Sequence, residues 1–285
     1  MGAKNTIKCY DICKKGEETM AFQRRYELTD EEWNRVKDLL PTEKTGRKGR
    51  PPTPNRPMLN AMIWLARSGA PWRDLPERFP PWESVYSRFR KWIDDGILDN
   101  IFRIFALEAE LGELSIDGSI VRAHQHSAGV KKNEIGRSRG GLSTKFHFIV
   151  DAYGYPVYFI LSEGQESDSK YAIPVLSQVN IEGSDVLGDK GYDADKIIDY
   201  IYESGGEPTI PSKANRIIQR QNDWWLYKER HKVECFFQKL KNYRRIATRY
   251  DKHAFTFAGF IGIACICIWM DCTVKKSMGV KNKVA

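Results

Sequence analysis

The sequence predicts an α/β protein in which helices pack on a layered sheet, preceded by an all-α region. Two changes of pattern support this prediction. Between residues 28 and 111 the apolar residues recur at helical spacing, and from Leu114 they follow the two-residue period of strands. After residue 163 helical and strand segments alternate, which is typical of strands joined by crossover helices.

The composition restricts the class of protein. The chain has 285 residues, 41% hydrophobic and 29% charged, which is typical of a globular protein with one large or two small domains. The net charge of +8 favours a polyanionic partner, nucleic acid before a membrane surface. The first residues lack the apolar stretch of a signal peptide, and the six cysteines show neither zinc-finger spacing nor a disulfide framework. We therefore expect a protein of the reducing cytosol.

The longest apolar run covers residues 257–270. It is short for a membrane span, so we expect a buried C-terminal core helix, with a transmembrane helix as the alternative. A basic tail follows at residues 271–285.

The N-terminal half is predicted to be helical. After an extension at residues 1–27, a helix opens at Thr29, with Glu32 completing a capping box, and Pro41 ends it. Further helices are expected at residues 56–68, 82–96 and 98–111. Short helices joined by tight turns favour a helix-turn-helix-like DNA-binding domain over residues 28–111, with a plain helical bundle as the alternative. The candidate DNA contacts on the third helix are Arg88, Arg90 and Lys91.

A basic, proline-rich segment at residues 46–57 interrupts these helices. Arg50 in its centre could enter a narrow A·T minor groove. A stiff basic linker is an equally good interpretation.

The sheet is predicted from the elements that follow. Strands are expected at residues 114–121, 145–152 and 156–163, the last two joined as a hairpin through Tyr153 and Gly154. A helix at 169–179, a strand at 184–189, a helix at 193–205, a strand at 207–212 and a long helix at 227–241 complete the order βββαβαβα.

The long helix carries two adjacent stripes. Val233, Phe236, Phe237 and Leu240 form its expected core face. Along the edge of that face lie four polar residues, namely Tyr227, Arg230, Glu234 and Lys241. Taken alone, such a stripe could be a solvated charged flank.

Three carboxylates stand at positions that a site would use. Asp117 lies within the first strand, Asp189 follows the fourth, and Glu234 lies at the rim of the late helix. Together they could bind Mg²⁺ or Mn²⁺, which prefer anionic oxygens, and two such ions can activate an attacking oxygen and stabilise a leaving one. The alternatives are a turn residue at Asp117 and a helix cap at Asp189.

The late helix has the pattern Tyr, two residues, Arg, three residues, Glu, six residues, Lys. This pattern resembles the signature of DDE transposases of bacterial insertion sequences, in the insertion sequence 5 family and the related insertion sequence 4 group. The segments "SIDGSIVRAHQHSAG", "GRSRGGLSTKFH" and "GDKGYDAD" resemble further blocks of that family, and the similarity runs from residue 28 to 270. It implies an RNase H-like catalytic core over residues 112–270.

The resemblance also implies the chemistry. Asp117, Asp189 and Glu234 would bind two divalent ions, Arg230 and Lys241 would hold phosphates, and Tyr227 would orient or stack. Only 45 residues separate Asp189 from Glu234, too few for the large β-rich insertion of some relatives.

Other basic residues are further candidates for DNA-phosphate contacts, with structural ion pairs as the alternative. They are Arg122, Arg137, Arg139 and Lys145. His124, His126 and His147 are expected to be structural more often than metal ligands. Trp224 and Trp225 are expected to pack in the core or at a helix start, with base stacking as the alternative.

The sequence thus predicts a transposase that binds terminal inverted repeats, cuts them by two-metal hydrolysis and joins them to target DNA. Its partners would be double-stranded DNA and further copies of the chain in a homodimer or larger synaptic assembly. We expect it in the bacterial cytoplasm, associated with the nucleoid and not with membrane. The alternatives are a metal-dependent nuclease without strand transfer and a non-catalytic, domesticated DNA-binding protein.

Overall fold

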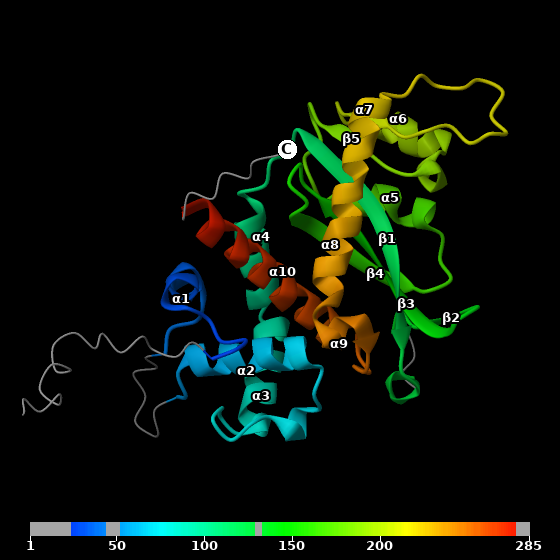
Figure 1. The fold of residues 1–285 in the computed structure, drawn as a ribbon. Helices are drawn as coiled ribbons and strands as arrows, with labels where there is room; N and C mark the ends of the chain where they lie inside the picture. The colour runs from blue at the N-terminus through cyan, green and yellow to red at the C-terminus, as the bar shows by residue number, and fades with distance from the viewer. Residues whose placement is uncertain (1–23, 44–51, 129–132, 278–285) are drawn as a thin grey trace, which may run out of the picture.

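The computed structural model describes residues 24–43, 52–128 and 133–277. Within them, seven strands form one mixed sheet with helices on both faces (Figure 1). The strands are β1 (Glu113–Ala123), β2 (Gly136–Ser138), β3 (Gly141–Val150), β4 (Pro156–Glu163), β5 (Asp185–Leu187), β6 (Glu207–Thr209) and β7 (Thr248–Arg249). The three long strands and the two short parallel strands confirm the predicted βββαβαβα order, whereas β2 and β7 were not predicted.

The strand pairing places β1 at the centre of the sheet. β1 pairs antiparallel with β3, which pairs antiparallel with β4. On its other edge β1 pairs parallel with β5 over Glu113 to Ser115, and with β7 at Arg122 and Ala123. The middle of this edge, which includes Asp117, therefore has no strand beside it among the described residues.

Four helices precede the sheet: α1 (Asp30–Val36), α2 (Asn55–Ser68), α3 (Trp82–Asp94) and α4 (Ile97–Ala106). The predicted capping box is present, with Thr29 Oγ accepting from the Glu32 N–H at 3.1 Å and the Glu32 carboxylate accepting from the Thr29 N–H at 2.7 Å. The fourth helix ends five residues earlier than predicted. Leu107 is 85% exposed, so the apolar pattern no longer faces the core there, and the chain turns into β1.

The last helix, α10 (Ala254–Ser277), confirms the prediction of a buried C-terminal core helix. It is long and apolar enough to cross a membrane, but 78% of its apolar window, Ala254–Asp271, is buried inside the protein. Phe260 packs on Phe89 of α3 with ring centroids 4.5 Å apart, and the Trp269 indole N–H donates to the Pro156 carbonyl of β4 at 2.9 Å. The N-terminal helices and one face of the sheet thus share a single core around α10 (Figure 1).

The other face of the sheet is covered by α5 (Asp168–Leu176) and α6 (Asp195–Glu203). Ile116 of β1 lies in this second core with Ile197 and Ile201. Alternate residues of β1 therefore face different cores, and Asp117 points to the face that α8 covers.

The late helix is segmented. α7 (Trp224–Tyr227) leads through a 3₁₀ turn, η5 (Lys228–Arg230), into α8 (His231–Lys241), and α9 (Arg244–Ala247) follows. The Asp223 carboxylate caps α7 by accepting the N–H groups of Trp225 and Leu226. The helical segment therefore begins three residues earlier than predicted. Val233, Phe236, Phe237 and Leu240 are buried, as the predicted core face requires.

Candidate active site

The first predicted acid lies at the centre of the sheet. Asp117 is on the stretch of β1 that, among the described residues, has no strand beside it on one edge, and 19% of its side chain is exposed. Its Oδ1 accepts the Gly118 N–H at 2.7 Å. The carboxylate is thus reachable from solvent but has lost most of its hydration.

One guanidinium joins two of the three predicted acids. Arg230 donates through Nη1 to Asp117 Oδ2 at 3.1 Å and through Nη2 to Glu234 Oε1 at 2.6 Å. Lys241, two turns further along α8, donates to Ser119 Oγ of β1 at 2.7 Å. Burial lowers the pKa of Lys241, so its ammonium is poorly compensated there. Arg230 and Lys241 of the polar stripe therefore contact β1, whereas 54% of the Glu234 side chain is exposed.

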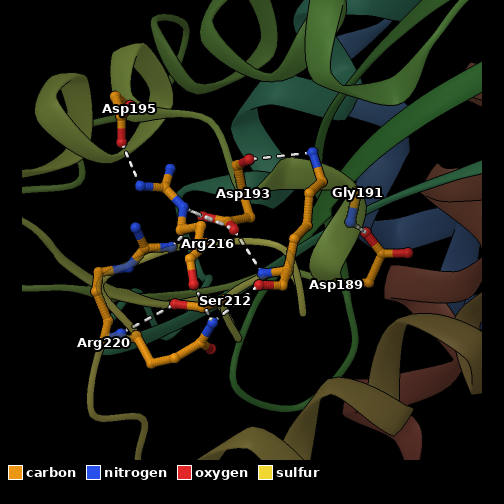
Figure 2. Close-up of polar contacts among 9 residues, drawn as sticks. Asp189, Gly191, Asp193, Asp195, Ser212, Arg216 and Arg220 are labelled. Atoms are coloured by element: carbon orange, nitrogen blue, oxygen red, sulfur yellow. Dashed lines mark hydrogen bonds and ion pairs between the residues drawn. The ribbon is translucent and has the colours of Figure 1, made fainter.

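Asp189 caps a turn and also acts through its charge on Asp117. It follows β5 and caps the 3₁₀ turn η4 (Lys190–Tyr192), with Oδ1 accepting the Gly191 N–H at 2.8 Å (Figure 2). Its negative charge also acts on Asp117. The cap that was an alternative to a functional role is compatible with one, since a single N–H bond leaves most of the carboxylate's acceptor capacity unused.

Burial and charge both act on Asp117. Loss of hydration raises the pKa of Asp117 to about 6, the Gly118 N–H and Arg230 act in the opposite direction, and the charges of Asp189 and Asp168 raise it. Burial is the main cause, and the Gly118 N–H and Arg230 offset only part of it. A cation bound at Asp117 would favour its ionised form.

Asp168 was not predicted as a site residue. It is the first residue of α5, and its carboxylate lies against the backbone of Gly118, on the opposite face of β1 from Asp117. The sequence signal that could have identified Asp168 was an acid at the start of the helix that follows the three antiparallel strands. Nothing local distinguished it from an ordinary first-turn acid.

The contacts of Lys145 argue against its predicted role in binding DNA phosphates. It is buried, and its Nζ donates to Asp168 Oδ2 at 3.0 Å and to the Glu166 carbonyl at 2.9 Å. The structural alternative describes it better, because β3 carries the side chain into the interior. His147 is also buried, with Nε2 2.8 Å from Ser162 Oγ and its ring stacked on Tyr171.

Another aspartate, Asp193, accepts several hydrogen bonds from the segment that leads to the late helix (Figure 2). It is buried and accepts the Lys213 N–H at 2.6 Å, Arg216 Nε at 2.9 Å and a further bond from Arg220. Burial alone would raise the pKa of Asp193, but these donors lower it to about 2. The segment between β6 and α7 is thereby tied to the loop that carries Asp189.

Trp224 and Trp225 lie at a helix start, which was one of the two expected places, and not in the core, because 61% and 79% of their surfaces are exposed. Asp223 caps that helix, and the Trp224 ring lies 5.7 Å from the Tyr227 ring. Ile217 and Ile218 on the preceding segment are exposed as well.

The remaining basic candidates fall into two groups. All three of the following arginines are exposed: Arg122 near the end of β1, Arg137 in β2 and Arg139 in the β2–β3 turn. On α3, Lys91 is exposed, whereas Arg88 bonds Asn55 Oδ1 at 2.6 Å and Arg90 lies 4.4 Å from the Phe255 ring centroid. Arg50 lies outside the described residues. Of the basic candidates, the structure therefore brings Arg230 to Asp117 and Glu234, and Lys241 to Ser119 on the same strand as Asp117.

The metal question depends on donors and on space. Within residues 24–43, 52–128 and 133–277, no three His, Cys, Asp or Glu residues already form a metal-binding cluster. Between Asp117 and Glu234 lies the guanidinium of Arg230. The donor atoms nevertheless fit a hard divalent cation, because all three groups are carboxylates.

The profile described as "Transposase DDE domain" matches residues 109–270, more than half of the chain. The chain belongs to the DDE transposase family. A second profile, described as a putative transposase of the IS4/5 family, matches residues 28–102. The predicted resemblance to insertion-sequence transposases is confirmed.

Two relatives of this DDE transposase cover part of it. The uncharacterized protein y4sN of Sinorhizobium fredii is 46% identical over 110 residues, 39% of this chain and 87% of that one. A putative transposase for insertion sequence element IS6501 of Brucella ovis is 42% identical over 131 residues, 45% of this chain and 99% of that one.

One solved structure shares the fold. It is the piggyBac transposase synaptic complex with hairpin DNA, with a TM-score of 0.51, 11% identity, and 86% of this chain and 72% of that chain covered. At this identity the likeness concerns the fold alone. The α/β, RNase H-like core preceded by an all-α region is confirmed as the fold class of this DDE transposase.

Proposed function

We propose that this chain binds the terminal inverted repeats of an insertion sequence, cuts the phosphodiester at each end and joins the end to target DNA. The observation that carries the proposal is the meeting of Asp117 and Glu234 on one guanidinium, with the charge of Asp189 acting on the same carboxylate. These residues are far apart in the sequence, and a purely structural salt bridge would not require the third acid.

Asp117, Asp189 and Glu234 are the groups that would hold two Mg²⁺ or Mn²⁺ ions. Such ions supply activation of an attacking oxygen and stabilisation of a leaving oxygen. The reaction needs no covalent link to the protein, so Tyr227 orients and does not attack; the Arg230 Cζ lies 6.0 Å from its ring centroid.

Arg230 and Lys241 are the proposed phosphate ligands beside the acids. Both face β1, and both are partly buried, which strengthens their attraction for an anion. Among the described residues, the Lys241 ammonium donates to a hydroxyl and pairs with no carboxylate, so a DNA phosphate would supply the negative charge.

The helices of residues 28–111 are proposed to recognise the element ends, with Lys91 as an exposed contact and Arg122, Arg137 and Arg139 as further phosphate contacts. The net charge of +8 supports a DNA partner. Two ends must be cut together, which favours a dimer or larger assembly, and the piggyBac relative in fold was solved as a synaptic complex.

Strand transfer of a pre-cut end distinguishes the transposase from a nuclease. Purified protein, Mg²⁺, a 3′-hydroxyl end of its own element and target plasmid should give joined product. Glu234→Gln should abolish joining and still bind the end. Glu229→Gln is the matched control, since Glu229 lies on the same segment and bonds Lys232. Cleavage without joining would favour the nuclease, and undiminished joining by Glu234→Gln would remove Glu234 from the site.

Recognition by the N-terminal helices needs a surface variant, because deleting them would open the shared core around α10. Lys91→Glu should weaken binding to the element end and reduce its salt dependence. Lys196→Glu on α6 is a charge-matched control on another face. Equal losses in both variants would show that only net charge matters.

A further inference from the structure

Asp168 occupies a position that the proposed chemistry does not yet use. Its carboxylate lies directly behind Gly118, the residue next to Asp117 on β1. A Cβ at Gly118 would overlap Asp168 Oδ1 and would lie 3.2 Å from His147 Nδ1. The backbone that carries Asp117 therefore rests on this carboxylate, and only glycine leaves room for the contact.

The carboxylate is held from the sheet. Lys145 Nζ lies 3.0 Å from Asp168 Oδ2, and His147 Nδ1 lies 3.3 Å from Asp168 Oδ1. Both basic residues are buried on β3, and each has a second partner, the Glu166 carbonyl for Lys145 and Ser162 Oγ for His147. Lys145 thus holds Asp168 Oδ2 by a hydrogen bond, whereas Asp168 Oδ1, which faces Gly118, makes the longer contact with His147 and has no hydrogen-bond partner among the described residues.

Asp168 also lies near the loop that carries Asp189. Burial raises the pKa of the Tyr192 phenol well above its ordinary range, and the charges of Asp168, Asp117 and Asp189 raise it further. Tyr192 belongs to η4, the turn that Asp189 caps. One buried phenol is thus close enough to be affected by Asp168 and by two of the proposed metal-binding acids.

The order Ser162, His147, Asp168 resembles a hydrolase triad, but the geometry argues against that activity. Ser162 and His147 are each 2% exposed, so no substrate reaches the hydroxyl. Ser162 Oγ also lies 3.3 Å from the Glu163 carbonyl, to which it donates. The arrangement orients Asp168 and performs no hydrolysis.

We propose that Asp168 is a positioning residue for the divalent-cation site at Asp117. It supports the β1 backbone at Gly118, and its fixed negative charge raises the affinity of the neighbouring carboxylates for a cation without ligating the ion. The inference rests on the proposed function, because it requires that Asp117 bind such an ion. Residues that support metal ligands in this way typically change metal affinity by about 10- to 100-fold when replaced.

The test measures Mn²⁺ affinity of the full-length chain without DNA, by calorimetry, so that no cleavage assay is involved. Asp168→Asn keeps the shape and removes the charge, and it should weaken Mn²⁺ binding about 10-fold or more. Lys145→Met removes the opposite charge, and it should leave the affinity unchanged or increase it. A purely structural role would give losses of the same sign in both variants.

Strand cleavage supplies a second readout. For Asp168→Asn the Mn²⁺ concentration needed for half-maximal cleavage should rise, while the rate at saturating Mn²⁺ approaches that of the wild type. Thermal unfolding of each variant establishes that it is folded. Where Asp168→Asn does not fold, Lys145→Met decides, and a weakened affinity in that variant overturns the proposal.

The outcomes separate this inference from the proposed function. If Asp117→Asn and Glu234→Gln lose Mn²⁺ binding but Asp168→Asn retains wild-type affinity, the positioning role is wrong and the metal site stands. If Asp117→Asn and Glu234→Gln bind Mn²⁺ like the wild type, the proposed function itself fails, and the inference with it.

Discussion

Asp193 and Asp117 both lie near η4 and both bond to arginines, yet their pKa values shift in opposite directions. Asp193 receives bonds from a backbone N–H and two guanidinium groups, and its pKa falls to about 2. Asp117 receives one backbone N–H and shares Arg230 with Glu234, and its pKa rises to about 6. Burial raises the pKa of both carboxyls, but the donors around Asp193 outweigh it, whereas at Asp117 burial prevails and the charges of Asp189 and Asp168 add to it.

The contrast separates a structural acid from a candidate catalytic one. Asp193 is fully compensated and fixes a loop. Asp117 is under-compensated, which costs the apo-protein stability and leaves charge available for a cation. Uncompensated carboxylates gathered in a reachable position are typical of functional sites.

The largest effect expected from this contrast is on catalysis. Asp117→Asn should reduce end cleavage at least about a hundredfold, because it removes one of the anionic oxygens that organise the reaction. Cleavage of labelled end DNA in Mg²⁺ measures it. Asp199→Asn, on the outer side of α6, is the control and should cleave normally. Comparable rates for Asp117→Asn and Asp199→Asn would show that Asp117 is not catalytic.

The next effect is on stability. Asp193→Asn should lower the free energy of unfolding by about 2 kcal/mol at pH 7, because the depressed pKa of Asp193 reports that much favourable interaction of its ionised form. Denaturant unfolding measures the loss. An Asp195→Asn variant, which removes only the exposed partner of Arg216, should lose far less. Equal losses of stability in the two variants would mean that the bonds to Asp193 do not stabilise this segment more than the exposed ion pair of Asp195 does.

Acid should remove the same contribution in the wild type. The folded pKa of Asp193, about 2, lies below the unfolded value near 3.8, so its stabilisation is present above about pH 4 and is lost as the pH falls toward 2. The free energies of unfolding of the wild type and Asp193→Asn should therefore converge as the pH falls from 5 to about 2. A constant difference between them across this range would contradict the stabilising role of ionised Asp193.

The smallest effect has the opposite sign. At pH 7 the free energy of unfolding of Asp117→Asn should equal that of the wild type or exceed it by about 1 kcal/mol, because the variant no longer ionises a carboxyl whose pKa is raised to about 6. The lost bond to Arg230 offsets part of the gain. The excess should vanish as the pH falls from about 6 to 4, where wild-type Asp117 becomes protonated. A clear loss of stability at pH 7 would contradict the account.

The sequence predicted those features that depend on local pattern. The strand at residues 156–163 was predicted to the residue, and the two stripes of α8 follow from helical periodicity. The order of Asp117, Asp189 and Glu234 on strand, loop and helix was also recognisable.

Features that depend on tertiary contacts were missed. Asp168 is 50 residues from Gly118 in sequence, and only the pairing of β1 with β3 brings the α5 start behind it. Asp193 gains its role from arginines more than 20 residues away. The core alternative for Trp224 and Trp225 failed for the same reason, because large aromatic residues are usually buried and only tertiary contacts show that these two are exposed.

The central claim is that Asp117, Asp189 and Glu234 form one metal-dependent cleavage site for the element's own ends. Mapping every nick that the purified chain makes on DNA carrying both ends and their flanks, in Mg²⁺ and in chelator, tests it most directly. The account predicts nicks at the element ends that require Mg²⁺ and disappear when any one of the three acids is replaced by its amide. Nicks at the ends that persist in chelator or in those variants would contradict it.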